Sequence, residues 1–181
     1  MATGDKVLET ARLRLRSFTL DDVDALHALW TSADVRKFLW DNEKIPREQT
    51  LEIVKKSMAL REDEGTGLWA VTDKEGNELI GFGGYWYFFE PPELQILYGL
   101  SPEHWGMGLA TELAKAFISY GFETLRLEEV VGSTDKPNIS SQRVMEKAGM
   151  QYRRRERKKG AHTNLDTVYY SITVSEFQSI R

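Results

Sequence analysis

The chain has 181 residues, a formal net charge of −4 and no cysteine, and 11% of its residues are aromatic. This length and composition suit a folded α/β protein, and we expect residues 1–181 to form a single domain. The missing cysteines exclude disulfides, zinc–thiolate sites and a covalent cysteine intermediate. The negative charge argues against direct nucleic-acid binding.

Signals for a membrane, secretion or a metal are not found in the sequence. No apolar run approaches the ~20 residues of a membrane span, and the first ten residues lack the apolar core of a secretory signal. His27, His104 and His162 are too far apart for an i, i+4 metal pair. We therefore expect a cytoplasmic protein with no membrane contact and no metal.

The first half of the chain predicts a strand, two helices and a β-hairpin. Residues 12–16 alternate Arg and Leu, which is typical of a half-buried strand. Thr19 is expected to cap a helix that runs through Trp30. A second helix is expected to start at Pro46 and to continue past residue 58, with Leu51, Val54 and Met58 facing inward. Strands at residues 68–72 and 78–89 flank a turn and form the hairpin, whose second strand is apolar on both faces and should be covered on both sides.

The second half predicts four more strands and two helices. A strand at residues 93–100 is followed by a helix at 108–122, a strand at 128–133 and a helix at 139–147. Closing strands are expected near residues 151–158 and 164–173. This order predicts an α/β (α+β) fold, a mixed sheet with helices on both faces.

The most informative segment is the turn between the strand at 93–100 and the helix after it. Gly106 and Gly108 allow the backbone to approach a ligand closely. The first amides of the helix have no partners within it, so this end suits a diphosphate. A plain tight turn is the alternative. A Walker loop is excluded because Gly-Lys-Ser/Thr is absent, and a Rossmann fingerprint is disfavoured because Thr111 occupies the place of its third glycine.

Two motifs give the sequence its resemblance to a known family. Residues 105–112, Trp-Gly-Met-Gly-Leu-Ala-Thr-Glu, resemble the acetyl-CoA loop of the RimJ/RimL-like branch of the GNAT superfamily, which commonly reads Trp-Gly-Lys-Gly-Tyr-Ala-Thr-Glu. Residues 138–150 are similar to the branch's N-x-x-S-x-R-V-x-E-K-x-G-F element. Residues 12–16 and 166–170 also look like the ends of that branch, so the resemblance covers nearly the whole chain.

The resemblance implies a mostly antiparallel central sheet of about seven strands, with strands four and five splayed to admit the pantetheine arm of acetyl-CoA. Gly99, inside the fourth strand, indicates a bulge or a close approach by a ligand. The diphosphate would rest on amides at the start of the following helix. The residues expected to bind the donor are Tyr98, Gly99, Leu100, Trp105, Gly106, Met107, Gly108, Leu109, Ala110, Thr111, Asn138, Ser141 and Arg143.

The expected catalytic residues are Glu93, Ser141 and Asn138. The branch commonly has a glutamate where this chain has Gln95, so Glu93, two residues earlier on the same face, is the candidate base; a solvated strand end is the alternative. Many family members have a tyrosine where this chain has Met145, which leaves Ser141 as the candidate donor to the thiolate. Asn138 would lie near the sulfur, or it is a plain helix cap. A backbone N–H near Leu100 is the expected oxyanion donor.

The sequence therefore predicts an N-acetyltransferase that moves acetyl from acetyl-CoA to a primary amine in a ternary complex. The acceptor is expected to be a protein N-terminus, such as that of a ribosomal protein, or a small amine. A non-catalytic acyl-CoA sensor is the alternative, and a homodimer is implied by the resemblance. Met107 removes the cation that this loop usually carries, for which Arg143 or Lys136 could compensate. The basic run at residues 153–159 is interpreted as a solvated or ion-paired face.

Overall fold

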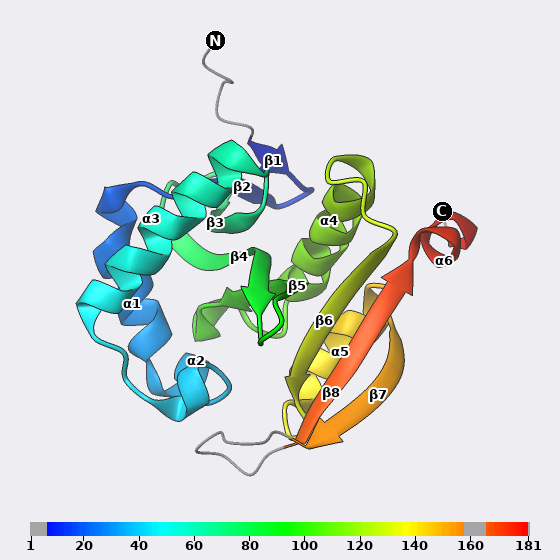
Figure 1. The fold of residues 1–181 in the computed structure, drawn as a ribbon. Helices are drawn as coiled ribbons and strands as arrows, with labels where there is room; N and C mark the ends of the chain where they lie inside the picture. The colour runs from blue at the N-terminus through cyan, green and yellow to red at the C-terminus, as the bar shows by residue number, and fades with distance from the viewer. Residues whose placement is uncertain (1–6, 158–165, 181) are drawn as a thin grey trace.

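The computed structural model describes residues 7–157 and 166–180. Five strands form an antiparallel sheet in chain order (Figure 1): β1 (Leu8–Glu9), β2 (Leu13–Ser17), β3 (Gly67–Asp73), β4 (Leu79–Phe88) and β5 (Glu93–Leu100). The alternation in β2 behaves as predicted, because Leu13 and Leu15 are fully buried while Arg14 and Arg16 reach the surface. The short strand β1 was not predicted.

Helices α1 (Val23–Thr31) and α3 (Arg47–Asp63) cover one face of this sheet, with α2 (Ala33–Arg36) and the 3-10 turns η1 (Leu20–Asp22) and η2 (Trp40–Asn42) between and beside them. Thr19 and Asp22 form a capping box that starts the first of these turns. Trp30 of α1 packs edge-on against Phe82 of β4, with ring centroids 5.4 Å apart. Burial of large side chains such as these contributes roughly 1.5–3 kcal/mol each.

Helix α4 (Leu109–Glu123) packs on the opposite face of the sheet and starts after the 3-10 turn η3 (Pro102–His104). Its apolar side is fully buried and includes Leu113, Ala114 and Phe117. Tyr85 of β4 donates a hydrogen bond to the carbonyl of Phe117 over 2.8 Å, which joins the sheet to the helix. Only the turn of residues 101–108 separates the end of β5 from the start of α4.

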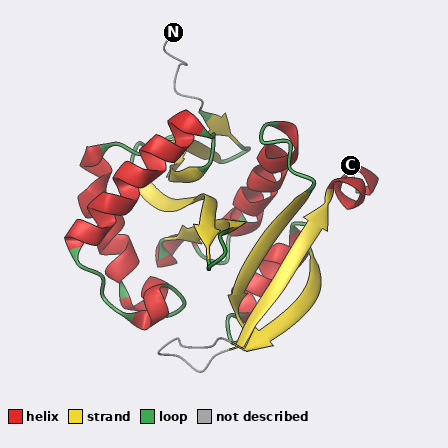
Figure 2. Ribbon diagram, viewed as in Figure 1, coloured by secondary structure: helices red, strands yellow, loops and turns green. Residues whose placement is uncertain are grey.

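A second antiparallel sheet of three strands stands beside the first, in the order β6 (Glu129–Asp135), β8 (Asp166–Thr173), β7 (Gln151–Arg157). Helix α5 (Ile139–Lys147) packs against it, and α6 (Val174–Ser179) ends the described chain (Figure 2). The expected single sheet of about seven strands is therefore eight strands in two sheets, and every pairing among the described strands is antiparallel. The α/β class with helices on both faces is confirmed.

Two expectations about buried faces were wrong. Met58 is 39% exposed; the buried side of α3 instead holds Thr50, Ile53, Val54 and Ser57. Strand β4 is buried from Ile80 to Tyr85, but Tyr87 is exposed, so its outer end is not covered on both sides. In α3 the polar residues Thr50 and Ser57 took buried places that apolar patterning assigned to a larger residue.

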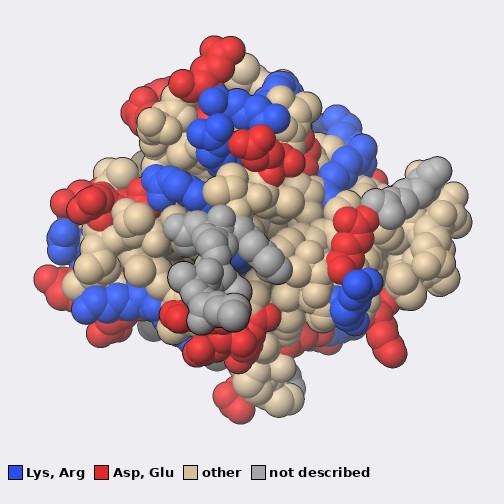
Figure 3. All heavy atoms as spheres, turned by 90° about the horizontal axis from the view of Figure 1, so that it is seen from above, with Lys and Arg blue, Asp and Glu red and all other residues tan. Residues whose placement is uncertain are grey.

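The surface carries mixed charge, with basic and acidic groups side by side on the face drawn in Figure 3. Three arginines of β7 are paired: Arg153 with Glu176, Arg154 with Glu156, and Arg155 with Asp166. This confirms the ion-paired interpretation for residues 153–156, and Arg157 is exposed; residues 158 and 159 of the basic run lie outside the described residues. Within the described ranges, no helix is long and apolar enough to cross a membrane.

Candidate functional site

The two sheets meet at β5 and β6 without a shared ladder of hydrogen bonds. Near the middle of the strands, Ser133 of β6 donates to the Gln95 side-chain oxygen of β5 over 2.6 Å. Three residues further along β5, the hydroxyl of Tyr98 contacts Ser141 of α5 instead of β6. The fourth and fifth predicted strands are therefore splayed, as the resemblance implied.

The backbone of β5 presents free groups to this opening. Ser101 N–H donates to the Ile80 carbonyl over 2.8 Å, and hydrogen-bonded pairs alternate along an antiparallel ladder. Leu100, which is opposite Gly81, and Tyr98, which is opposite Gly83, therefore direct their peptide groups away from β4. The Leu100 carbonyl accepts a bond from the Trp105 indole over 2.8 Å, and the Leu100 N–H remains free among the described residues.

Gly99 has a different role from the expected bulge. The register between β4 and β5 is continuous from Leu100 to Glu93, so no residue is inserted. A Cβ on Gly99 would lie 2.6 Å from two ring carbons of Phe82. Phe82 thus requires a glycine at this position, and the need is internal packing on the α1–α3 side of the sheet.

The turn between β5 and α4 exposes a series of backbone amides. Gly106 and Gly108 have φ of 74° and 78°, in the left-handed region that favours glycine. The amides of residues 106–111 donate no hydrogen bond to any described residue. A Cβ on Gly106 would meet nothing within 4 Å, and Trp105 and Met107 are 50% and 56% exposed. These free donors at a helix N-terminus fit a diphosphate.

Asn138 and Ser141 lie at the start of α5, across the opening from β5. The Asn138 side-chain oxygen accepts from Ser141 N–H at 3.2 Å, and its amide nitrogen donates to Thr134 Oγ1 at 3.0 Å. Asn138 is therefore a helix cap in this structure. The hydroxyls of Ser141 and Tyr98 are 3.3 Å apart, and either can donate. Burial raises the pKa of Tyr98 to about 12, against a smaller opposite effect of Ser141, so its phenol is protonated at neutral pH.

Glu93 stands at the start of β5, on the same face as Gln95. The Gln95 amide donates to the Glu93 carboxylate over 2.7 Å, and Gln95 is 1% exposed. Because Gln95 is also held by Ser133, these contacts fix the position of the carboxylate. Glu93 further acts electrostatically on Arg154 and Tyr169 of the second sheet. It is thus an anchored group rather than a loose strand end.

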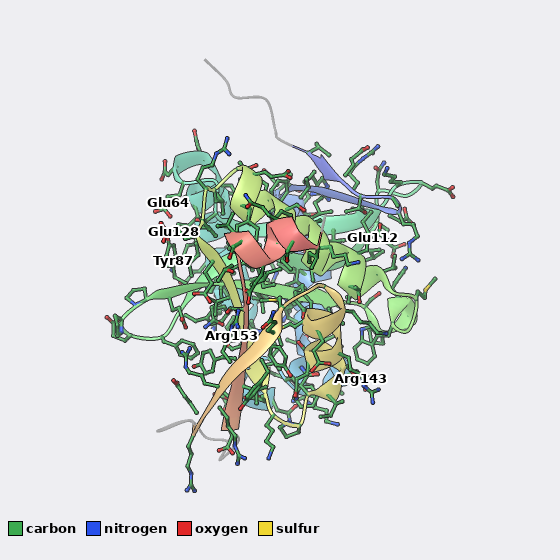
Figure 4. All side chains as sticks on the ribbon, turned by 90° about the vertical axis from the view of Figure 1, so that its right-hand side faces the viewer. Glu64, Tyr87, Glu112, Glu128, Arg143 and Arg153 are labelled. Atoms are coloured by element: carbon green, nitrogen blue, oxygen red, sulfur yellow. The ribbon has the colours of Figure 1, made fainter. Side chains whose placement is uncertain are left out.

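The predicted residue Arg143, and Met145 at the place of the family's tyrosine, stand apart from this group. Arg143 is exposed on α5, at the edge of the molecule in Figure 4, and makes no hydrogen bond or ion pair with a described residue. Met145 is 1% exposed and packs in the core, where its sulfur would lie 3.1 Å from a Cβ on Gly132. Met145 therefore cannot contribute to the opening, and Ser141 remains the hydroxyl nearest to it on α5.

A cluster around Glu112 was not predicted from the sequence. Glu112, on α4 beside the first strands (Figure 4), accepts hydrogen bonds from the Thr10 hydroxyl, the Arg12 amide and the Arg12 guanidinium at 2.6–2.8 Å. Burial opposes ionisation of this carboxyl, but the three hydrogen bonds outweigh it and lower its pKa. Arg12 also donates to the Met107 carbonyl at 2.9 Å. No spacing in the sequence signals this contact.

Comparison with known proteins identifies the family. The model of the acetyltransferase (GNAT) domain matches residues 12–151. The uncharacterized N-acetyltransferase YoaA of Bacillus subtilis is 30% identical over 80% of this chain and 82% of its own length. The chain belongs to the GNAT acetyltransferase family. It is thus an N-acetyltransferase, and acetyl-CoA is the acyl donor.

Solved structures agree with this membership. A GNAT acetyltransferase from Bacillus anthracis is 28% identical and superimposes with a TM-score of 0.79, covering 93% of this chain and 98% of the other. RimL, a ribosomal L7/L12 α-N-protein acetyltransferase solved with coenzyme A, has a TM-score of 0.78 over 94% of this chain and 99% of its own. At 16% identity, that likeness shows a shared fold. In this GNAT acetyltransferase, the turn with the free amides lies between the outward-facing end of β5 and the start of α4.

Proposed function

We propose that this GNAT protein, as a single domain of residues 1–181, transfers acetyl from acetyl-CoA to a primary amine by direct attack in a ternary complex. The observation that carries the proposal is the free edge of β5 at Tyr98 and Leu100, which leads to the unpaired amides of residues 106–111. An extended chain of amides ending in a diphosphate matches this sequence of donors and acceptors.

Binding of the donor divides between the two segments. The peptide groups of Tyr98 and Leu100, on either side of Gly99, form the strand edge along which the pantetheine amides pair. The diphosphate rests on the backbone of Trp105, Gly106, Met107, Gly108, Leu109, Ala110 and Thr111, with Asn138, Ser141 and Arg143 on the opposite side. The fit is supported by glycine φ values and by the free amides, which leave room and donors for an anion.

The chemistry requires a proton acceptor, an oxyanion donor and help for the leaving thiolate. Acetyl-CoA supplies an acetyl group activated as a thioester. As the C–N bond forms and the C–S bond breaks, the Glu93 carboxylate takes the amine proton. The free N–H of Leu100 donates to the oxyanion, and the hydroxyl of Ser141 donates to sulfur. Asn138 holds Ser141 in place through the cap bond of 3.2 Å.

The acceptor is a cationic amine, either a protein N-terminal α-amine or a small amine. This is supported by the charged groups around Tyr169. Its hydroxyl interacts electrostatically with two carboxylates, Glu93 and Glu156, and with one cation, Arg154. Their net negative charge attracts an ammonium group and repels an anionic substrate. The name of RimL gives a ribosomal protein N-terminus as one acceptor of this kind.

Calorimetric titration with acetyl-CoA, with NAD⁺ and ATP as controls, tests the donor site. Micromolar, acetyl-CoA-selective binding is the expected result, and equal binding of NAD⁺ would reject the proposal. Thiol release with a panel of ribosomal-protein peptides and polyamines then separates the acceptor classes. Binding without thiol release for any amine would favour a non-catalytic sensor instead.

A further inference from the structure

The turn that receives the diphosphate contains no cationic side chain. Its residues 105–108 are Trp, Gly, Met and Gly, and the exposed Met107 stands where the resembling loops carry lysine. Backbone amides can still bind phosphate, but they provide partial charges where coenzyme A brings several full negative charges. A cation from elsewhere in the fold would make up this deficit.

Arg12, which directly precedes β2, touches this turn. Its Nη1 donates to the carbonyl of Met107 over 2.9 Å, and its Nε donates to Glu112 over 2.8 Å. Glu112 lies in the first turn of α4 and is 16% exposed in its side chain. The guanidinium is therefore fixed at two points, one in the turn and one in the helix that follows.

The third nitrogen of Arg12 remains available. Nη2 donates to no acceptor among the described residues, and a Cβ on Gly108 would lie 3.6 Å from it. The Arg12 side chain is 50% exposed. A planar guanidinium that is held by one side and open on the other is preorganised for an oxyanion, because little rotamer entropy is lost on binding.

The nearby Arg14 of β2 provides a comparison. Arg14 is similarly exposed, at 41%, but its Nε pairs with Glu9 at 3.0 Å, and it makes no hydrogen bond or ion pair with described residues of 105–112. Arg12 and Arg14 thus share exposure and ion pairing, and they differ in that only Arg12 bonds to the turn. Substituting each arginine in turn therefore distinguishes a role in ligand binding from the general effect of removing a surface charge.

We infer that Arg12 binds a phosphate group of coenzyme A and supplies, from the first strands, the cation that the turn lacks at Met107. This inference rests on the proposed donor site. The phosphate is either one of the diphosphate or the 3′-phosphate, since both carry the same chemistry. Glu112 and Thr10 then act as positioning residues that hold the guanidinium beside Gly108.

The test is calorimetric binding of acetyl-CoA, acetyl-dephospho-CoA and S-acetylpantetheine to the wild type, Arg12→Gln and Arg14→Gln. Arg12→Gln is expected to weaken acetyl-CoA binding roughly tenfold, as for loss of a hydrogen bond to a charged group, and to leave S-acetylpantetheine unchanged. Arg14→Gln should bind all three as the wild type does. A loss that disappears with acetyl-dephospho-CoA assigns the 3′-phosphate, and one that persists assigns the diphosphate.

A charge rescue distinguishes binding from mere positioning of the turn. Met107→Lys in the Arg12→Gln background should recover most of the affinity, because the lysine returns a cation to the turn without restoring the Arg12 contacts. If Arg12→Gln does not fold, Arg12→Lys carries the same comparison with a smaller loss. Unchanged acetyl-CoA binding in a folded Arg12 variant, or an equal loss for S-acetylpantetheine, overturns the inference. Failure of the wild type to bind acetyl-CoA rejects the donor site itself.

Discussion

The carboxylate of Glu93 is held by a neutral group, since the Gln95 amide donates to it over 2.7 Å while Ser133 fixes Gln95. A positioned carboxylate that accepts the amine proton typically contributes 10²–10⁴-fold. Glu93→Gln is therefore expected to lower kcat/KM roughly 10²-fold at neutral pH. The exposed Glu90→Gln serves as the control. Initial rates between pH 6 and 9 check this, and an unchanged profile would remove Glu93 from the mechanism.

Ser141 is the second residue whose role a single substitution can test. Ser141→Ala removes the hydroxyl proposed to donate to sulfur and is expected to lower kcat roughly tenfold with little change in the KM for acetyl-CoA. Ser140→Ala, an exposed neighbour on α5, is the matched control. Tyr98, whose pKa is about 12 because of burial, stays protonated, so Tyr98→Phe should add or remove no limb below pH 10. A KM effect without a kcat effect would assign Ser141 to donor binding instead.

Residues differ in how far the sequence alone could place them. Gly106 and Gly108 were predictable, because positive φ before a helix leaves a local pattern that glycine satisfies. Arg12 was not, because 95 positions separate it from Met107 and folding brings them together. The sequence singled out Gly99 as a bulge or a ligand contact, but the glycine is needed because the ring of Phe82 lies against it. Phe82 is on the neighbouring strand, and no local sequence pattern reveals such a partner.

At the scale of elements, α6 is tied to β7 through one carboxylate. Arg153 Nη2 donates to both carboxylate oxygens of Glu176, at 2.8 and 2.7 Å, and the Thr173 amide donates to the same carboxylate at 2.8 Å in a capping box. The hydrogen bond from Arg153, followed by that from Thr173, lowers the pKa of Glu176 to about 2. The helix therefore depends on an ionised carboxylate for its attachment.

This dependence predicts a pH effect on stability. A carboxyl whose pKa falls on folding stabilises the folded state above its ordinary pKa of 4.5, and the contribution is lost as pH falls toward about 2. Glu176→Gln should thus lower Tm by about 2–4 °C at pH 7, as for roughly 1 kcal/mol, and by much less near pH 2.5. Gln178→Ala, exposed on the same helix, is the control. An equal Tm difference at both pH values would contradict the assignment.

The longer elements followed from sequence, whereas short or unusually packed ones did not. Helix α4 and strand β5 appeared close to their predicted bounds because the first has a clear 3.6-residue period and the second ends at a glycine-rich turn. Helices α2 and α6, of 4 and 6 residues, are too short to show a period. The inward face of α3 was misjudged because Thr50 and Ser57 are buried where Met58 was expected.

At the scale of the whole molecule, the division into two sheets is what the apolar pattern could not reveal. Strand patterning gives burial on each face, but it does not state whether neighbouring strands share a ladder. Here a hydrogen bond between the Ser133 and Gln95 side chains joins β6 to β5. Further along β5 the strands separate, and the Tyr98 hydroxyl contacts Ser141 of α5 instead. A continuous sheet would use the peptide groups of Leu100 internally. The Leu100 N–H instead stays free among the described residues, and this is the structural condition for binding an extended donor.

The same arrangement predicts the order of chemical events. The chain has no cysteine, so no thiol can carry the acetyl group as an intermediate. The Ser141 hydroxyl faces the Tyr98 hydroxyl and is not paired with a base that would make it a nucleophile. Donor and acceptor must then be present together, and initial rates at varied concentrations of both should give intersecting lines in double-reciprocal plots. Protein incubated with acetyl-CoA alone should show no added acetyl group by mass spectrometry. Parallel lines together with an acetylated enzyme would replace direct transfer by a two-step route through a residue of the chain.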